Sequence, residues 1–209
     1  ACGDADAAFK GAARVMRAEF RSEHLYHAQM EPFNATAWVR GDEVDLWSPT
    51  QGQLWAREVA AKAAGTVETK VRVHTTFVGG GFGLRTEQLV NAQAVTLSKA
   101  TGKPVKVIWS REDDLRNSAY RPAAAQRIEA AISADGRIVG WRHRIAADSI
   151  IRRARTMSWN QLKGYDVVVM SGAAHTYDVP NRFFEYLHED RGLPVGYWMA
   201  NGAGYTKFA

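Results

Sequence analysis

The residues best suited to chemistry lie in a glycine-rich segment at positions 76–83, Thr-Phe-Val-Gly-Gly-Gly-Phe-Gly. Three consecutive glycines, Gly79, Gly80 and Gly81, leave one stretch of backbone without a Cβ, so that another molecule can approach it closely, and they allow positive φ without steric cost. The N–H groups of such a loop can donate hydrogen bonds to an oxyanion or to a metal-oxo group. A plain tight turn between a strand and a helix fits the same residues, so neighbouring motifs must decide between the two interpretations.

The segment does not match the dinucleotide fingerprint G-x-G-x-x-G. Starting from Gly79, the last glycine falls one position early, and starting from Gly81, Arg85 and Thr86 stand in the region where a glycine is required. No acidic residue on a following strand is placed to bind a ribose. A dinucleotide-binding or nucleic-acid-binding protein is therefore the weakest alternative, and no nucleic-acid partner is expected.

Three further motifs flank the glycine segment, at residues 27–32 (HAQMEP), 48–51 (SPTQ) and 193–198 (LPVGYW). SPTQ is a polar cluster at an expected helix start. His27 is a conceivable metal ligand, but a lone histidine is more often a hydrogen-bonded structural residue. No set of His, Asp, Glu and Cys residues has the spacing of a metal site.

The hydrophobic pattern supplies the elements that must position these motifs. Helices are expected from Asp4 or Asp6 to residue 13, from 49–50 to 65, and at 86–100, with a short one near Trp159. Strands are expected at residues 14–20, 35–48 (as a hairpin), 66–75, 105–109, 126–145 (as a hairpin around Asp135-Gly136) and 183–187. Residues 111–114 are polar and turn-like. This order predicts an α+β fold with mixed β-sheets and flanking helices.

Composition limits the class of protein. The 209 residues are 46% hydrophobic and 23% charged, which is typical of a folded globular protein with one large domain or two small ones. Cys2 is the single cysteine, so the chain can form no internal disulfide and no cysteine-bound metal cluster. No run of 18 apolar residues predicts a membrane span, and the first residues do not resemble a signal peptide.

The chain is basic, with a formal net charge of +5 and a pI of about 9.4. One local cluster consists of Arg152, Arg153 and Arg155. A basic balance favours anionic ligands, but a solvated basic surface is the preferred explanation.

Seven segments in a fixed order resemble the molybdopterin-binding part of the xanthine oxidase and aldehyde oxidoreductase family, and most of all the large subunit of the isoquinoline 1-oxidoreductase type. These segments are HAQMEPFNATAWV (27–39), SPTQ (48–51), VHTTFVGGGFG (73–83), GKPVKVIWSREDD (102–114), AYRPA (119–123), YDVPN (177–181) and LPVGYW (193–198). The resemblance covers nearly the whole chain and is weakest at residues 146–170.

The resemblance implies an α+β molybdenum domain that buries a molybdenum-pterin cofactor, whose metal is held by the pterin sulfurs and not by protein side chains. It implies oxidation of aldehydes or N-heterocycles with oxygen derived from water, and transfer of electrons to iron–sulfur clusters on a small partner subunit. Residues 1–209 are then expected to be part of a molybdopterin-binding domain, with a possible subdivision near residues 146–166 and with the rest of a longer polypeptide missing at both ends.

The resemblance also implies five cofactor-binding residues: Gln51, Gly80, Gly81, Phe82 and Gly83. Gln51 matches the glutamine beside the apical metal ligand, where an amide NH₂ can donate to an oxo group without adding charge. Phe82 and Gly83 match the Phe-Gly pair at the metal, where the glycine N–H points at a metal ligand or at the substrate. A Gln51 that faces solvent and a Phe82 that belongs to the core are the alternatives.

Met30 and Glu31 match a family motif that shapes the pocket wall, and a structural turn explains them equally well. Three departures from the family pattern are evident. Thr86 stands where many relatives have a pocket glutamate, and Glu87 lies one position further, which rotates a helical side chain by about 100°. Met199 replaces an arginine found in many relatives.

The third departure concerns the family's essential general base, a glutamate expected far beyond Ala209, so no catalytic residue is assigned in this chain. The chain alone is therefore expected neither to retain the cofactor well nor to turn over. A non-catalytic binding or scaffold domain that keeps the fold is the alternative function. Family resemblance suggests a periplasmic or membrane-associated protein, with membrane association only through parts outside this chain.

Overall fold

The chain folds into two compact units. The computed structural model describes residues 2–154 and 156–199. The first unit is formed by Ala1–Leu25 together with Tyr120–Ala209, and the inserted unit is formed by Tyr26–Ala119. None of the helices in the described residues is both long enough and apolar enough to cross a membrane.

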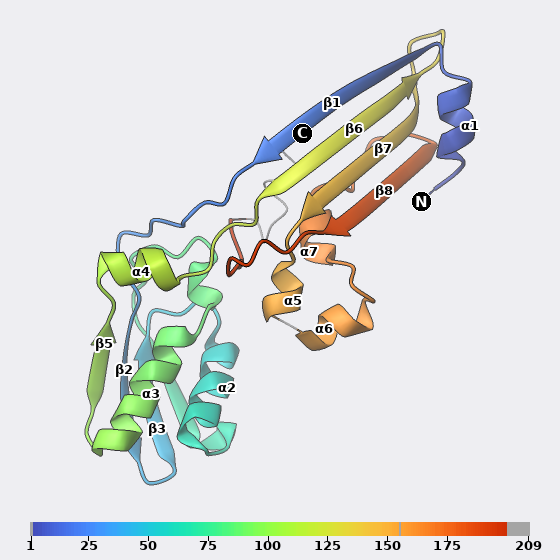
Figure 1. Cartoon of the computed structure of the whole chain (residues 1–209). Helices are drawn as coiled ribbons and strands as arrows, with labels where there is room; N and C mark the ends of the chain where they lie inside the picture. The colour runs from blue at the N-terminus through green and yellow to red at the C-terminus, as the bar shows by residue number, and fades with distance from the viewer. Residues whose placement is uncertain (1, 155, 200–209) are drawn as a thin grey trace. The chain divides into compact units, whose positions relative to one another are not determined.

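The inserted unit is a four-stranded mixed sheet with two main helices (Figure 1). The strand order is β4-β3-β2-β5, with β2 antiparallel to both β3 and β5 and with β3 parallel to β4. The strands are β2 (Asn34–Arg40), β3 (Glu43–Ser48), β4 (Val71–Thr75) and β5 (Val105–Ile108). The helices are α2 (Gln53–Ala64), α3 (Leu89–Thr101) and α4 (Arg111–Asn117), with short 3₁₀ turns η1 (Glu68–Lys70) and η2 (Leu84–Thr86).

Strand alternation builds the core of this unit. Ala35, Ala37 and Val39 on β2 and Val44 and Leu46 on β3 are buried, and α3 packs on β2. Because side chains alternate along a strand, the β2 residues that lie between these buried ones in the sequence face away from the helices. Helix α2 packs on β4 and on α3 through small residues, which allow a close approach: Ala56, Ala60, Ala61 and Ala64.

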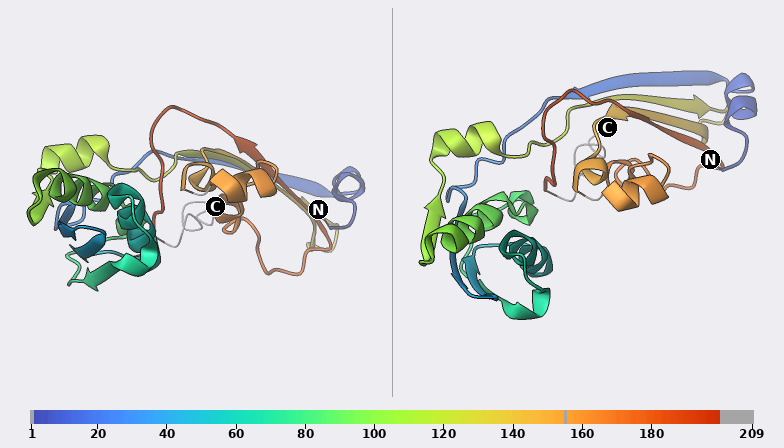
Figure 2. Two further views of the ribbon diagram at one scale, coloured as in Figure 1. Left: turned by 90° about the horizontal axis from the view of Figure 1, so that it is seen from below. Right: turned by 60° about the horizontal axis from the view of Figure 1, so that its bottom comes forward.

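The first unit has a second mixed sheet, in the order β1-β6-β7-β8, which three short helices accompany on one face (Figure 2). The strands are β1 (Arg14–Ser22), β6 (Ala124–Ile132), β7 (Ile138–Ala147) and β8 (Asn181–His188), and only β7 and β8 run parallel within this sheet. The helices of the unit are α1 (Ala5–Lys10), α5 (Ile150–Ala154), α6 (Thr156–Gln161) and α7 (Val167–Met170).

The core of the first unit lies between this sheet and the segment that contains α7. Ala124, Ile145 and Ala147 pack with Val169 and Met170. The subdivision expected from the sequence at residues 146–166 falls inside this unit, whereas the chain passes between the two units after Leu25 and Ala119.

The predicted α+β class with mixed sheets is confirmed, and so is the hairpin around Asp135-Gly136, where Gly136 has φ of 83°. Several boundaries were wrong. The first helix, expected to reach residue 13, ends at Lys10, and the helix expected from residues 49–50 begins at Gln53. The strand expected at 66–75 is shortened by η1, and the helix expected at 86–100 begins at Leu89 because η2 extends the glycine segment.

The polar segment 111–114 is a helix and not a turn. The Ser110 side chain caps α4 by accepting a 3.1 Å hydrogen bond from the Asp113 N–H, and it donates to the Asp113 carboxylate over 2.8 Å. Acidic residues in the first turn interact favourably with the N-terminal end of the helix dipole. The turn predicted for this segment is therefore wrong, although Ser110 is an N-cap signal present in the sequence.

One buried histidine makes the stability of the first unit depend on pH. His143 on β7 is buried, and its Nε2 atom lies 2.8 Å from the Gln126 Oε1 atom. Burial, with a smaller contribution from nearby His175, lowers the pKa of His143 to about 4. In the unfolded chain the His143 imidazole binds a proton with a pKa of about 6.5, whereas in the folded chain it is protonated only near pH 4.

We therefore expect the free energy of unfolding to fall as the pH is lowered from about 6.5 to about 4, because protons favour the unfolded state over that range. In a His143→Gln variant this dependence should be weaker. Urea denaturation of both proteins at several pH values measures it. Identical slopes in the two proteins would contradict the assignment.

Candidate functional site

The glycine segment and Gln51 lie at the carboxyl ends of two neighbouring parallel strands of the inserted unit. Strand β3 ends at Ser48 and β4 ends at Thr75, and these two residues are paired in register. The Thr76 N–H donates to the Ser48 carbonyl over 3.3 Å, so the two chains leave the sheet side by side. Ligands of open α/β sheets bind at this edge, outside the carboxyl ends of the strands.

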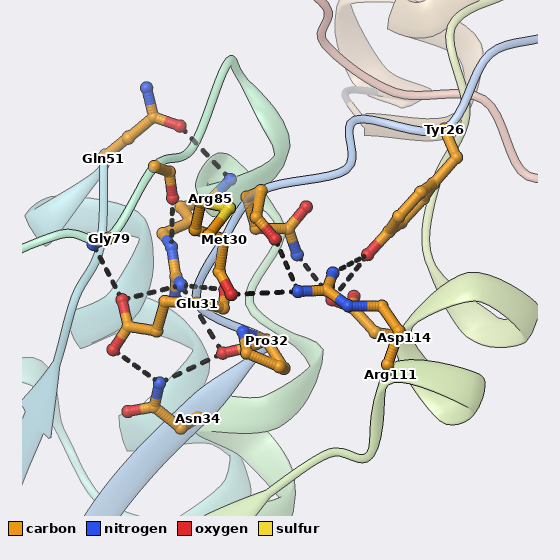
Figure 3. A network of polar contacts seen from close by, with 12 residues as sticks. Tyr26, Met30, Glu31, Pro32, Asn34, Gln51, Gly79, Arg85, Arg111 and Asp114 are labelled. Carbon is orange, nitrogen blue, oxygen red and sulfur yellow. Dashed lines mark hydrogen bonds and ion pairs between the residues drawn. The ribbon is translucent and has the colours of Figure 1, made fainter.

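The Gln51 side chain faces the glycine segment. Its Oε1 atom accepts hydrogen bonds from the backbone N–H groups of Gly83 at 3.1 Å and of Arg85 at 3.2 Å. Figure 3 shows the bond to Arg85. The backbone N–H of Gln51 in turn donates to the backbone carbonyl of Arg85 over 3.1 Å. Because only the carbonyl end of an amide can accept these bonds, the NH₂ group must point away from the loop.

The amide nitrogen of Gln51 is thereby left available. Figure 3 shows it directed away from Gly79 and Arg85, and in the described part of the chain no hydrogen-bond partner contacts it. The residue itself is exposed. Position 51 and the 82–83 peptide, which the resemblance places in one site, therefore face each other.

The glycines are required where the backbone approaches other groups. A Cβ on Gly81 would lie 2.4 Å from the Gln51 Oε1 atom, so a side chain there would displace Gln51. Gly80 and Gly83 have φ of 95° and 98°, values that side chains disfavour. Phe82 also has positive φ, and 46% of its surface is exposed, so it does not belong to the core.

The Gly83 N–H does not have the role that the resemblance implied. In this structure it donates to the Gln51 oxygen and does not point at an open ligand position. The physical reason is the neighbouring Arg85 N–H, which shares the same acceptor and holds the amide oxygen over both donors.

Glu31 fixes the other end of the glycine segment. Its Oε2 atom accepts from the Gly79 N–H at 2.8 Å, and its Oε1 atom accepts from the Asn34 amide at 2.8 Å. The Glu31 N–H also donates to the Gly79 carbonyl over 3.0 Å. A Cβ on Gly79 would lie 2.5 Å from the Glu31 Cβ atom, so the close contact depends on glycine. Met30, the other member of the motif, is 88% exposed.

Arg85 joins these parts, and the sequence reasoning did not find it. Its side chain is 2% exposed, and its Nε atom donates to the Gly80 carbonyl over 2.8 Å. Its Nη2 atom donates to the Glu31 carbonyl over 2.7 Å and to the Glu31 carboxylate over 2.8 Å. Burial lowers the pKa of Arg85, and the carboxylate of Glu31 acts in the opposite direction.

A second arginine holds residues 29 and 30. The Arg111 Nη2 atom donates to the carbonyls of Gln29 at 2.6 Å and Met30 at 3.0 Å, and its Nη1 atom donates to the Tyr26 hydroxyl and to Asp114. Asp114 is fully buried and also accepts from the Gln29 amide at 2.6 Å. Burial, followed by the hydrogen bond to Asp114, raises the pKa of Tyr26 to about 12.

The remaining sequence candidates have structural contacts. The Thr86 hydroxyl donates to the Gly83 carbonyl over 2.7 Å, and His27 is buried. LPVGYW belongs to the first unit, where the Tyr120 N–H donates to the Pro194 carbonyl over 2.8 Å. Met199, in the same unit, is 53% exposed. Among the described residues, no group of three or more His, Cys, Asp and Glu side chains could hold a metal ion.

Comparison with known proteins agrees with this architecture. A family model described as the molybdopterin cofactor-binding domain matches residues 1–186. Isoquinoline 1-oxidoreductase subunit beta of Brevundimonas diminuta is 37% identical over 198 residues, which cover 94% of this chain and 25% of that protein. The relative named membrane-bound aldehyde dehydrogenase [pyrroloquinoline-quinone], from Gluconacetobacter polyoxogenes, is 32% identical over 178 residues, which cover 83% of this chain and 23% of that protein.

The structure of the aldehyde oxidoreductase of Desulfovibrio gigas matches with a TM-score of 0.83 at 18% identity, over 100% of this chain and 22% of that one. This likeness shows the fold. The chain thus belongs to the molybdopterin cofactor-binding domain family, and its predicted fold and family are confirmed. It spans about a quarter of the length of the curated relatives it matches.

Replacement of Gly81 tests the contact with Gln51. Gly81 has no positive φ, so Gly81→Ala adds no backbone strain, and its methyl group meets only the flexible end of Gln51. We expect the free energy of unfolding to change by less than about 1 kcal/mol. The hydrogen exchange of the Gly83 N–H should accelerate, as measured by NMR.

The matched control for that experiment is Gly11→Ala, because a Cβ on Gly11 meets only the Ala7 carbonyl at an ordinary 3.6 Å. It should leave the Gly83 exchange rate unchanged. An unchanged rate in Gly81→Ala as well would show that Gln51 does not protect Gly83.

Removal of the Tyr26 hydroxyl tests the second arginine network. Tyr26→Phe removes a hydroxyl that donates a 2.7 Å hydrogen bond to the fully buried Asp114 carboxylate. We expect this loss to lower the free energy of unfolding by about 1–3 kcal/mol when no water replaces the hydroxyl. Urea denaturation measures the loss. Tyr177→Phe is the control, since Tyr177 is 74% exposed and should tolerate the change. Equal stability of the two variants would contradict the network.

Proposed function

We propose that this chain is part of a molybdenum hydroxylase that oxidises aldehydes or N-heterocycles with oxygen derived from water. Gln51 and the glycine residues Gly80, Gly81 and Gly83 form one wall of its molybdopterin site, with Phe82 beside them. The observation that carries the proposal is the pair of backbone N–H groups on the Gln51 oxygen, which directs a neutral NH₂ donor away from the loop.

The residues present suit a cofactor with oxygen ligands. Gly81 has no side chain that would displace the Gln51 amide, and the Gln51 NH₂ can donate to an oxygen ligand without adding charge. The Glu31 carboxylate lies beside the loop, but the Arg85 guanidinium and the Gly79 N–H compensate its charge. Little uncompensated negative charge therefore opposes an anionic group at this edge.

When bound, the cofactor would supply the metal centre at which oxygen transfer and oxidation take place. The contribution of this chain is orientation and hydrogen bonding. A preorganised donor such as the Gln51 NH₂ stabilises negative charge that develops on an oxygen, and it needs no reorganisation during the reaction. The general base is proposed to lie beyond Ala209, and electrons are proposed to pass to iron–sulfur clusters on a small partner subunit.

The exposed apolar surface around the loop supports the proposal that segments of the longer polypeptide cover it. Phe77 is fully exposed, Leu54 is 71% exposed, and Met30, Val78 and Phe82 also expose apolar surface. Exposed apolar groups near one loop mark an interaction surface. Since the chain spans about a quarter of its relatives, we propose that the longer polypeptide covers these residues and that the chain alone neither retains the cofactor nor turns over.

A non-catalytic domain that keeps the fold is the second candidate. The Thr86 hydroxyl is bound to the Gly83 carbonyl at the position where many relatives carry a pocket glutamate, so this chain offers no carboxylate there. The two candidates differ in whether the longer protein carries molybdenum and turns over.

The test is metal analysis and turnover of the longer protein that contains this chain, expressed with its partner subunit. We expect close to one molybdenum per protein, and we expect Gln51→Ala to lower kcat on the order of 10²-fold at unchanged molybdenum content. Gln53→Ala, at an exposed residue of α2, should keep the parent rate. Absence of molybdenum, or full activity of Gln51→Ala, would refute the proposal.

A further inference from the structure

Arg85 connects three segments that are distant in the sequence. Its guanidinium contacts the carbonyl of Gly80 in the glycine segment and both the carbonyl and the carboxylate of Glu31. Its backbone N–H and carbonyl pair with Gln51. A single residue therefore joins the loop, the HAQMEP motif and the amide of the candidate site.

Side chain and backbone of Arg85 act on different partners. Glycine residues lose more conformational freedom on folding than any others, so the segment at Gly79 and Gly80 needs external contacts to keep one shape. The planar guanidinium supplies them with several donors in a fixed arrangement. With the guanidinium fixed, the Arg85 N–H is held beside the Gly83 N–H, and together they set the orientation of the Gln51 amide.

The geometry points to Arg85 as a positioning residue that acts on the candidate site through Gln51. This inference rests on the proposed function for the role of Gln51, but the structural part concerns contacts within this chain alone. The charge of Arg85 is almost completely buried, and the Glu31 carboxylate compensates it, so the pair works as a unit.

Lysine is the informative replacement. Arg85→Lys keeps the positive charge and the backbone, but a single ammonium group on a shorter, flexible chain cannot reproduce the contacts to Gly80 and to both acceptors of Glu31. Glu31→Gln is a second variant in case the first does not fold. It keeps an acceptor for the Gly79 N–H and removes the charge that compensates Arg85.

Arg111→Lys is the matched control. Arg111 also donates to backbone carbonyls and a carboxylate in the inserted unit, but its acceptors are Gln29, Met30, Tyr26 and Asp114. In the described part of the chain it forms no hydrogen bond or ion pair with the glycine segment. It therefore reports the effect of losing an arginine network without loss of the contacts to Gly80.

The first measurement uses this chain without cofactor. We expect the Gly83 N–H to exchange about two- to tenfold faster in Arg85→Lys and in Glu31→Gln than in the parent, relative to the slowest amides of the inserted unit. In Arg111→Lys this ratio should stay at the parent value. Equal acceleration in all three variants, or none in Arg85→Lys and Glu31→Gln, would overturn the positioning role.

The second measurement uses the longer protein loaded with its cofactor. If Arg85 acts through Gln51, Arg85→Lys lowers kcat, and the double variant Arg85→Lys/Gln51→Ala loses no more than Gln51→Ala alone. Losses that multiply would show that Arg85 acts independently of Gln51 and overturn the inference. Because the exchange measurement needs no cofactor, failure of the proposed function and failure of the positioning role give different results.

Discussion

The ion pair between the buried Arg85 and the partly exposed Glu31 is the contact on which the shape of the glycine segment depends. A loop that must let a ligand approach its backbone has no side chains with which to anchor itself, so its neighbours must provide the anchors. Burial of a guanidinium is costly, and the cost is offset only when its donors are satisfied. Here the Nε and Nη2 atoms of Arg85 donate to the carbonyls of Gly80 and Glu31 and to the Glu31 carboxylate, and the same contacts fix the loop. The parallel strands β3 and β4 bring Gln51 to the other side of that loop.

Much of the fold could be predicted from the sequence because its signals are local. Alternation predicted the strands of both sheets, and Asp135-Gly136 predicted the long hairpin, since a turn with positive φ needs such residues. The proximity of Gln51 to the Phe82-Gly83 peptide was also expected, although only from the family resemblance. The short helix expected near Trp159 is present as α6, whereas α5 and α7 were not predicted because they are only five and four residues long and show too little periodicity.

The polar networks could not be predicted in the same way. Arg85 and Glu31 are separated by 54 positions, and Tyr26 and Asp114 by 88, so no periodicity or spacing rule connects them. The division into two units was hidden for a similar reason. The chain leaves the first unit after Leu25 and returns at Tyr120 without a change in composition, so only the three-dimensional contacts reveal it. The Ser110 cap of α4 is different, because its signal was present in the sequence and a turn was preferred.

The proposed function depends on a Gln51 amide whose oxygen is held by two backbone N–H groups, which leaves its nitrogen available to donate to an oxygen of the cofactor. A structure of the longer protein with its molybdopterin cofactor bound tests this most directly. The predicted result is a Gln51 Nε2 atom about 2.7–3.2 Å from an oxygen ligand of the metal, with Oε1 still on the Arg85 N–H. A cofactor bound away from the glycine segment, or a Gln51 amide turned so that its nitrogen faces Gly83, would contradict the proposed role of Gln51.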